Sequence, residues 1–148
     1  MDSFPDALAE ELLRVARRLR RDTQQRVAPL GLNPHQARAL RVIGQAAPLR
    51  PSAVAEELHI AARSATDSIA GLATSGLVDR RPDPADGRAH LLVLTPAGEA
   101  VLAEVTTIRS EVAAEVFGRL TEAEQASLAS LLQQLAADPA KPVANSSP

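Results

Sequence analysis

The sequence predicts a mainly α-helical fold with one small β-hairpin. Apolar residues recur at steps of three and four through most of the chain, which is the period of an amphipathic helix. Two strand-like runs, at residues 77–81 and 90–94, flank a segment rich in Pro, Asp and Gly, which indicates a hairpin. Two short helical segments joined by a tight turn precede it. We therefore expect a helix-turn-helix unit followed by a hairpin, with longer helices on both sides.

Composition indicates one modest domain without cysteine chemistry. The chain has 148 residues, of which 45% are hydrophobic, enough for a single core. No cysteine is present, which excludes disulfides, thiolate metal sites and cysteine redox sensors. The first twelve residues carry four acids and no base, and no stretch approaches the roughly 18 apolar residues of a membrane span. We expect a soluble cytoplasmic protein with no membrane partner.

The net charge of −2 hides an uneven distribution along the chain. Residues 13–88 hold thirteen arginines and seven acids, whereas residues 89–148 hold three basic and seven acidic residues. A basic centre between acidic ends is typical of a protein whose middle segment contacts phosphates. Arginines that only solvate helix surfaces would produce the same count, so charge leaves both interpretations open.

Two helices are expected before the helix-turn-helix unit. The first covers residues 6–27, where one apolar face is formed by Leu8, Leu12, Val15 and Leu19. A second helix begins after Asn33, which is suited to be its N-cap, with Pro34 at the first helical position and Gln36 completing a capping box. We expect this helix to reach about residue 45, with Leu40 and Ile43 pointing inward.

The helix-turn-helix unit follows directly. A third helix over residues 52–58 and a fourth over residues 62–75 are separated by a link of only three residues. In the fourth helix Ala65, Ile69 and Leu72 form one apolar stripe, and Gly76 is well placed to end it. In such a unit the second helix is free to enter a major groove.

The hairpin and two further helices complete the chain. Asp86-Gly87 is expected near the hairpin tip, because such a pair favours a tight turn. Thr95-Pro96 begins a long helix, and Thr121 with Glu124 forms a capping box for the last one. The apolar stripes of these helices are Val101, Val105, Ile108, Val112 and Val116, then Leu128, Leu131, Leu132 and Leu135. Residues 138–148 form a Pro- and Ser-rich segment that we expect to be a flexible tail.

Two motifs in the centre of the chain resemble those of the MarR (multiple antibiotic resistance regulator) family. The family's wing motif, Asp-x-Arg, five residues and Leu-Thr, matches Asp86-Gly87-Arg88 followed by Leu94-Thr95. The Leu-x-x-x-Gly-Leu-Val motif after the recognition helix matches residues 72–78. The resemblance spans about residues 8–136. It implies a single domain over 1–137, with a winged helix-turn-helix at 33–95 and dimerisation helices at about 8–30 and 96–137.

The resemblance also implies a function and a mechanism. Family members are bacterial homodimers that bind pseudo-palindromic operators in double-stranded DNA, so we expect a sequence-specific transcriptional regulator, in the first place a repressor. A small-molecule effector between the dimerisation helices and the DNA-binding lobes would release it. The apolar stripes of the outer helices exceed what one small lobe needs, which independently favours a symmetric dimer.

The expected DNA contacts lie on the fourth helix and the hairpin. Arg88 would enter a minor groove beside Asp86, which in the family holds the arginine in place, and Arg80 and Arg81 would contact phosphates. The exposed face of the fourth helix would supply Arg63, Ser64, Thr66, Asp67 and Ser68. An ordinary solvated polar face is the alternative for each set. The chain departs from the family at Asp67, which is often basic in relatives, and at Ala61 and Ala62, which provide no side-chain cap.

The residues give less support to an effector site, a metal site or a cofactor site than to a DNA-binding surface. The first helix borders the family's effector cavity, so the expected effector-binding residues are Arg14, Arg17, Arg18 and Arg21. The chain has no Trp or Tyr, which argues against an aromatic-lined pocket. The three histidines, His35, His59 and His90, are too dispersed to indicate a metal site, and no cofactor motif is present.

Two other classes of function differ in how well the residues support them. An enzyme is not supported, because the chain lacks a Gly-rich phosphate loop, a cysteine and a paired His and carboxylate. The alternative that stays open is a winged-helix module that binds another protein and no longer binds DNA. Asp67 and the two alanines at the start of the fourth helix would favour that module.

Overall fold

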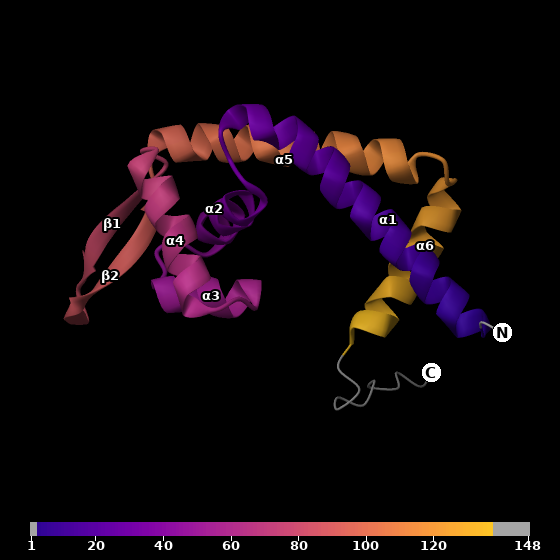
Figure 1. The fold of residues 1–148 in the computed structure, drawn as a ribbon, viewed down its shortest axis with the longest axis horizontal. Coiled ribbons are helices and arrows are strands. Elements are labelled where there is room, and N and C mark those ends of the chain that lie inside the picture. Colours follow the sequence, from indigo (N-terminus) through magenta and orange to yellow (C-terminus); the bar gives the residue numbers. More distant parts are fainter. Residues whose placement is uncertain (1–2, 138–148) are drawn as a thin grey trace, which may run out of the picture. The chain divides into compact units, whose positions relative to one another are not determined.

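The computed structural model describes residues 3–137, and the predicted tail at 138–148 lies outside the described residues. The expected element order is confirmed (Figure 1). The elements are α1 (Phe4–Val27), a short 3-10 turn η1 (Ala28–Leu30), α2 (Pro34–Ala46), α3 (Pro51–Leu58), α4 (Ala62–Thr74), β1 (Val78–Asp83), β2 (Asp86–Leu94), α5 (Pro96–Phe117) and α6 (Glu122–Ala136). The chain divides into two compact units between Val112 and Ala113, within α5.

The predicted capping boxes all form. The Asn33 side chain accepts a hydrogen bond from the Gln36 amide at 2.8 Å, and the Gln36 side chain accepts one from the Asn33 amide at 3.0 Å. Thr121 and Glu124 make the same reciprocal pair at the start of α6. These bonds satisfy amide groups that a helix leaves unpaired at its first turn, which is why each helix begins where it does.

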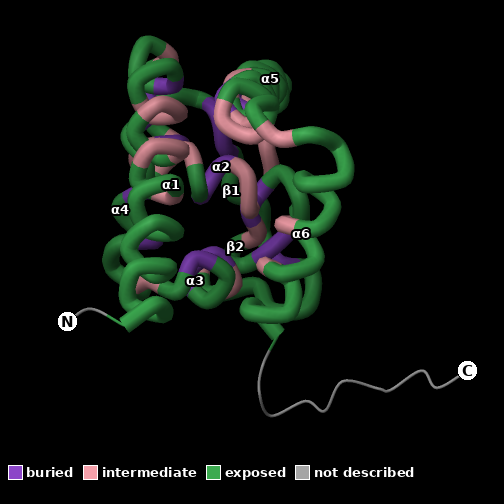
Figure 2. Tube along the Cα trace, turned by 90° about the vertical axis from the view of Figure 1, so that its right-hand side faces the viewer, coloured by how far each residue is buried: buried purple, intermediate pink, exposed green. Residues whose placement is uncertain are grey.

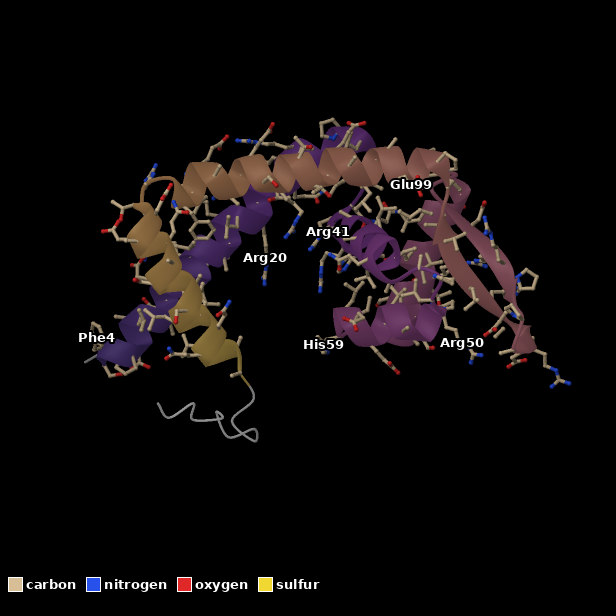
Figure 3. The ribbon with its side chains drawn as sticks, turned by 180° about the vertical axis from the view of Figure 1, so that it is seen from behind. Phe4, Arg20, Arg41, Arg50, His59 and Glu99 are labelled. Atoms are coloured by element: carbon tan, nitrogen blue, oxygen red, sulfur yellow. The ribbon has the colours of Figure 1, made fainter. Side chains whose placement is uncertain are left out.

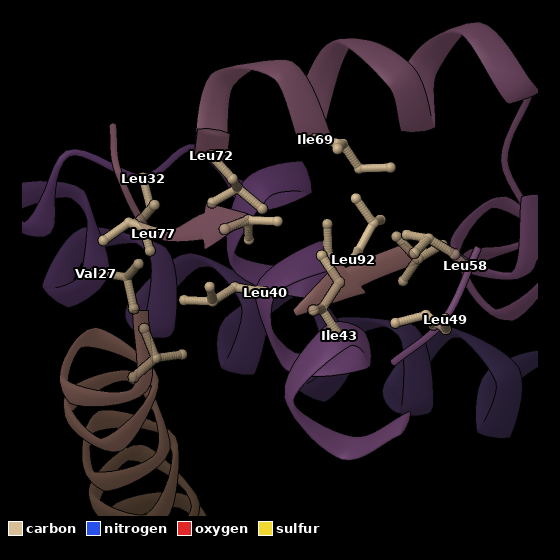
Figure 4. Close-up of a cluster of buried hydrophobic side chains, with 14 residues drawn as sticks. Val27, Leu32, Leu40, Ile43, Leu49, Leu58, Ile69, Leu72, Leu77 and Leu92 are labelled. Atoms are coloured by element: carbon tan, nitrogen blue, oxygen red, sulfur yellow. The ribbon is translucent and has the colours of Figure 1, made fainter. Parts of the chain in front are cut away.

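One apolar core holds α2, α3, α4 and the hairpin together. Leu40 and Ile43 point inward from α2, as predicted, and share the core with Ile69 and Leu72 of the α4 stripe, whose third member, Ala65, is also buried. Figure 4 shows the central side chains of this cluster, labelled Val27, Leu32, Leu40, Ile43, Leu49, Leu58, Ile69, Leu72, Leu77 and Leu92. Leu49 also pairs with Leu92 through two backbone hydrogen bonds of 2.8 and 3.3 Å, so the chain before α3 is fastened to β2.

The outer helices leave much of their apolar surface uncovered. In α1, Phe4 is 82% exposed, Leu8 57% and Leu12 48%, and Val27 at the end of the helix is its only buried residue. Exposed positions, green in Figure 2, also cover most of α6, where Leu131 is 56% and Leu135 73% exposed. Among residues 3–137, no helix combines the length and the apolar character needed to cross a membrane.

Thr95 connects the end of the helix-turn-helix unit to α5. Its hydroxyl donates to the Gly76 carbonyl at 2.6 Å and accepts from the Gly98 amide at 3.0 Å, while its own amide donates to the Leu77 carbonyl at 3.1 Å. Gly76 has a φ of 73°, in the left-handed region where glycine carries no side-chain penalty. The residue predicted to end α4, Gly76, and the residue predicted to begin α5, Thr95, are therefore linked directly by a hydrogen bond.

A substitution at Gly98 tests the close packing of the start of α5 against the backbone of Leu77. A methyl group at Gly98 would overlap the backbone carbonyl of Leu77. We expect Gly98→Ala to lower the free energy of unfolding by about 1 to 3 kcal/mol, because overpacking outweighs the better helix propensity of Ala. Urea denaturation followed by circular dichroism measures the change.

Gly87→Ala is the matched control. Gly87 has an ordinary φ, and a methyl group added there would meet no heavy atom within 4 Å, so we expect a change within about 0.5 kcal/mol. A Gly98→Ala protein as stable as Gly87→Ala would contradict the close contact between α5 and Leu77.

Candidate nucleic-acid interface

The start of α4 is exposed while its opposite face is fixed in the core. His59, in the left-handed region at φ 51°, ends α3, and Ala61 precedes α4 without a side-chain cap, as the sequence indicates. The amide groups of the first turn of α4 therefore have no side-chain partner at the cap. Arg63, Ser64 and Asp67 lie exposed on this part of the helix. Such a helix end presents donors and the positive end of a dipole to an anion.

Two of the predicted α4 residues use their hydroxyl groups within the helix. Thr66 is exposed and its hydroxyl donates to the Ala62 carbonyl at 2.9 Å, which leaves its oxygen free to accept. Ser68 is only 7% exposed, and its hydroxyl donates to the Ser64 carbonyl at 3.0 Å. The prediction that Ser68 lies on the exposed face is wrong, because Ser68 flanks Ile69 on the side that packs against the core.

The start of α2 lies next to α4 and adds a residue that sequence reasoning missed. A polar hollow of about 240 Å³ is lined by Asn33, His35, Ser64, Asp67 and Ser68. The sequence offered His35 only as a dispersed histidine, although its place in the first turn of a capped helix was a usable signal. His35 is exposed and joins the polar surface of α4 in the described structure.

The hairpin β1–β2, which we call the wing, turns within the predicted Pro-, Asp- and Gly-rich segment. Its two strands pair from Val78 with Leu94 to Asp83 with Asp86, leaving Pro84 and Ala85 as the turn. Asp86 and Gly87 follow this turn directly as the first residues of β2, so their predicted place near the tip is confirmed, although they do not form the turn itself. Pro84 has a φ suited to the first turn position, and the Asp83 carboxylate accepts a hydrogen bond from the Ala85 amide at 2.9 Å.

The wing arginines are all exposed. Arg80 and Arg81 are consecutive in β1, so their side chains leave opposite faces of the hairpin and do not share one phosphate-facing surface. Arg88 is the third residue after the turn. The Asp86 carboxylate accepts a hydrogen bond from the Arg88 backbone amide at 3.1 Å, so it orders the main chain of Arg88 and leaves the guanidinium projecting.

The expected effector residues of α1 are mostly ion-paired on the helix surface. Arg14 lies 2.7 Å from Glu11, and Asp22 pairs with both Arg18 at 3.5 Å and Arg21 at 3.1 Å. Arg17 is exposed. These pairs describe a solvated helix face, and neither the polar hollow beside α4 nor the hollow along α3 is lined by α1.

A second group of arginines was not singled out from the sequence. Arg38 and Arg41 lie three residues apart on α2, and Arg109 comes from α5. Burial lowers the pKa of Arg41 from its usual value, and the charges of Arg109 and Arg38 lower it further. Figure 3 shows Arg41 on α2 in the part of the molecule below α5. Arg41 is therefore repelled by both of these arginines, an effect that a bound anion would reduce, while Arg38 also donates to the Leu58 carbonyl at 3.2 Å.

The described residues contain no group of three or more His, Cys, Asp or Glu side chains that could hold a metal ion. His35, His59 and His90 belong to α2, to the end of α3 and to β2.

Comparison with known proteins agrees with this geometry. The sequence model of the MarR family matches residues 30–89. An uncharacterized HTH-type transcriptional regulator of Mycobacterium bovis is 30% identical over 118 residues, which cover 80% of this chain and 82% of the relative.

Solved structures match along most of their length. A mutant MarR from Escherichia coli complexed with operator DNA has a TM-score of 0.79 and 26% identity, covering 93% of this chain and 100% of that one. A MarR family protein of Mycobacterium tuberculosis in complex with DNA has a TM-score of 0.76 and 25% identity, covering 88% and 98% of the two chains. The chain therefore belongs to the MarR family of winged helix-turn-helix regulators, and it is a transcriptional regulator, not an enzyme.

Proposed function

We propose that the chain represses transcription by binding DNA as a homodimer through α4 and the wing. The observation that carries this proposal is the exposed polar start of α4 beside an arginine-bearing hairpin, both attached to one core. The operator-bound Escherichia coli protein supports it, since that match covers 93% of this chain. We further propose that residues 1–137 act as one domain of a bacterial cytoplasmic protein, in which residues 33–95 contact DNA.

The α4 helix is assigned to the major groove. Arg63 has the donors to read guanine, and Asp67 can accept from the amino group of cytosine. Ser64 and Thr66 suit phosphate contacts, with His35 at the start of α2 as an additional one. An acid at position 67 repels phosphate, so its place on this face favours a base contact at the centre of the groove.

The wing is assigned to the adjacent minor groove and backbone. Arg88 follows the turn closely, and its guanidinium suits the negative potential of a narrow minor groove. Arg80 and Arg81 leave opposite faces of the hairpin, so one of them is expected to contact phosphate while the other remains in solvent.

Removal of the Arg88 guanidinium tests the wing. We expect Arg88→Ala to weaken binding by about 1 to 3 kcal/mol, or about 5- to 150-fold, because one groove contact is lost. Fluorescence anisotropy with a labelled duplex from upstream of the protein's own gene, across about 50 to 200 mM salt, measures the change and its salt dependence.

Arg119→Ala is the control for charge alone. Arg119 is an exposed arginine between α5 and α6, outside the proposed interface. Equal losses in both variants would contradict the assignment of Arg88 to the minor groove. A DNA affinity that does not change with salt concentration would contradict any interface with the phosphates.

The exposed apolar residues of α1 and α6 support dimerisation. A second copy is the partner we propose, because a symmetric dimer covers the same surface on both chains at once. Two copies of α4 would then read two equivalent half-sites, about one helical turn of DNA apart, which is why we propose a pseudo-palindromic operator.

A charged side chain in this surface should weaken the dimer. We expect Leu8→Glu to raise the dimer dissociation constant by at least about tenfold, because burying a leucine contributes about 1.5 to 3 kcal/mol. Sedimentation velocity over a range of concentrations measures it. Gln25→Glu adds the same charge at an exposed α1 position and should leave the dimer intact. A monomeric wild-type protein would overturn the dimer proposal.

We also propose that an anionic small molecule binds at Arg38, Arg41 and Arg109 and changes DNA affinity. The proposal is supported by the half-buried position of Arg41 and by the repulsion that lowers its pKa. The α1 arginines expected from the resemblance remain candidates, and Arg17 is the one of the four without an ion pair among the described residues.

Benzoate is a suitable first probe of this site. At ten times its dissociation constant it should stabilise the fold by about 1.4 kcal/mol and raise Tm by about 3 to 6 °C. Differential scanning fluorimetry measures the shift, which Arg41→Gln should abolish and Arg119→Gln should not. An equal shift with neutral benzyl alcohol would show that charge is not recognised.

One observation favours the protein-binding alternative. The exposed start of α4 carries Asp67, whose carboxylate repels phosphate. Absence of salt-dependent binding to the upstream duplex and to sheared genomic DNA would make this alternative the leading function.

A further inference from the structure

An ion pair joins the wing to the start of the helix-turn-helix unit. Arg50 precedes α3, and Asp83 ends β1, 33 residues later in the chain. We propose that the Arg50–Asp83 ion pair positions the wing, and with it Arg88, for DNA binding. This proposal rests on the proposed DNA-binding function and assigns positioning roles to two residues that do not themselves read DNA.

The geometry of the pair is well defined. Arg50 donates from Nε at 3.0 Å and from Nη2 at 2.6 Å to the same oxygen, Oδ2, of Asp83. The other oxygen, Oδ1, accepts the Ala85 amide at 2.9 Å. The Asp83 side chain is only 8% exposed, whereas that of Arg50 is 48% exposed. Figure 3 shows Arg50 between α3 and the hairpin.

The two oxygens of Asp83 have different roles. The bond to Ala85 is local and closes the turn, so it would form in an isolated hairpin. The bonds to Arg50 connect the turn to a different element and limit how the hairpin can swing about its base. Arg88 lies only five residues after Asp83, and its amide donates to the Asp86 carboxylate. The position of the Arg88 backbone therefore depends on the orientation of the turn.

The Asp83 carboxylate remains ionised in the pH range where DNA binding is measured. The Ala85 amide and then the Arg50 guanidinium lower the pKa of Asp83 below 3.8. A depressed pKa means that the ionised pair is present above the usual range of the carboxyl and is lost only as pH falls through the lowered value. The ion pair therefore persists from neutral pH down to mildly acidic pH.

Electrostatics and positioning predict opposite changes in DNA affinity when the Asp83 carboxylate is removed. A carboxylate in the wing repels phosphate, so its removal should strengthen DNA binding. Positioning predicts weaker binding, because a mobile wing must be ordered when it binds. The sign of the change therefore separates the two roles.

The first experiment compares two substitutions in the same strand. Asp83→Asn keeps an acceptor for Ala85 but removes the charge that Arg50 binds. Asp79→Asn makes the same charge change at an exposed position of β1. Fluorescence anisotropy with the upstream duplex should show a loss of about three- to tenfold for Asp83→Asn and no loss for Asp79→Asn. Unchanged or tighter binding by Asp83→Asn would overturn the proposal.

A double-mutant cycle with Arg88 identifies the route of the effect. If the ion pair acts by positioning Arg88, Asp83→Asn should change affinity by less than about twofold in the Arg88→Ala background. Full additivity would overturn the proposal. Arg50→Gln should behave like Asp83→Asn; if it instead lowers the salt slope in every background, Arg50 is a phosphate contact and the positioning role is wrong.

A measurement without DNA keeps the inference separate from the proposed function. Hydrogen exchange of the dimer or monomer, as purified, should show faster exchange over residues 84–91 in both Asp83→Asn and Arg50→Gln, with the core amides of α2 unchanged. Unchanged exchange in the wing would overturn the ion pair's role even if DNA binds. Faster exchange in a protein that binds no DNA would uphold the positioning role and reject the proposed function.

Discussion

The burial of Ile69, Leu72 and Leu92 against α2 determines which side of α4 remains exposed. These side chains are at most 1% exposed, and in a densely packed core a helix cannot rotate without opening a cavity. Since successive residues differ by about 100° around a helix, fixing this stripe also fixes the directions of Arg63 and Asp67. The polar surface of α4 is thus a consequence of apolar packing on its other side.

The wing depends on the same core but needs further attachments. A two-stranded hairpin buries too little surface to hold an orientation by itself. The backbone pair of Leu49 with Leu92 and the hydrogen bonds of Thr95 fasten its base, and Arg50 fastens its turn through Asp83. The Leu-Thr end of the wing motif therefore has a structural role, because Thr95 links the wing to α5 by hydrogen bonds. The Asp-x-Arg start of the motif carries the exposed guanidinium of Arg88.

The sequence predicted features that rest on near neighbours and missed those that join distant segments. Asn33 and Gln36 are three residues apart, so their capping box was visible in the sequence and is confirmed. Asp86-Gly87 correctly indicated the neighbourhood of the turn, but not the residues that form it, which are Pro84 and Ala85 beside the Asp83–Ala85 hydrogen bond. Nothing local indicates that Arg50 reaches Asp83, because only the assembled core brings α3 and the wing together.

The overall charge explains why positioning matters in this protein. With a net charge of −2, the chain as a whole does not attract DNA, so its affinity must come from a few arginines held close to the phosphates and grooves. An acid at the wing turn weakens the local positive field further. That cost is offset only if the acid improves the geometry of the remaining contacts, because an ordered wing loses less conformational entropy on binding than a mobile one. A buried carboxylate in a hairpin that we propose contacts DNA therefore favours binding that depends more on preorganised geometry than on charge.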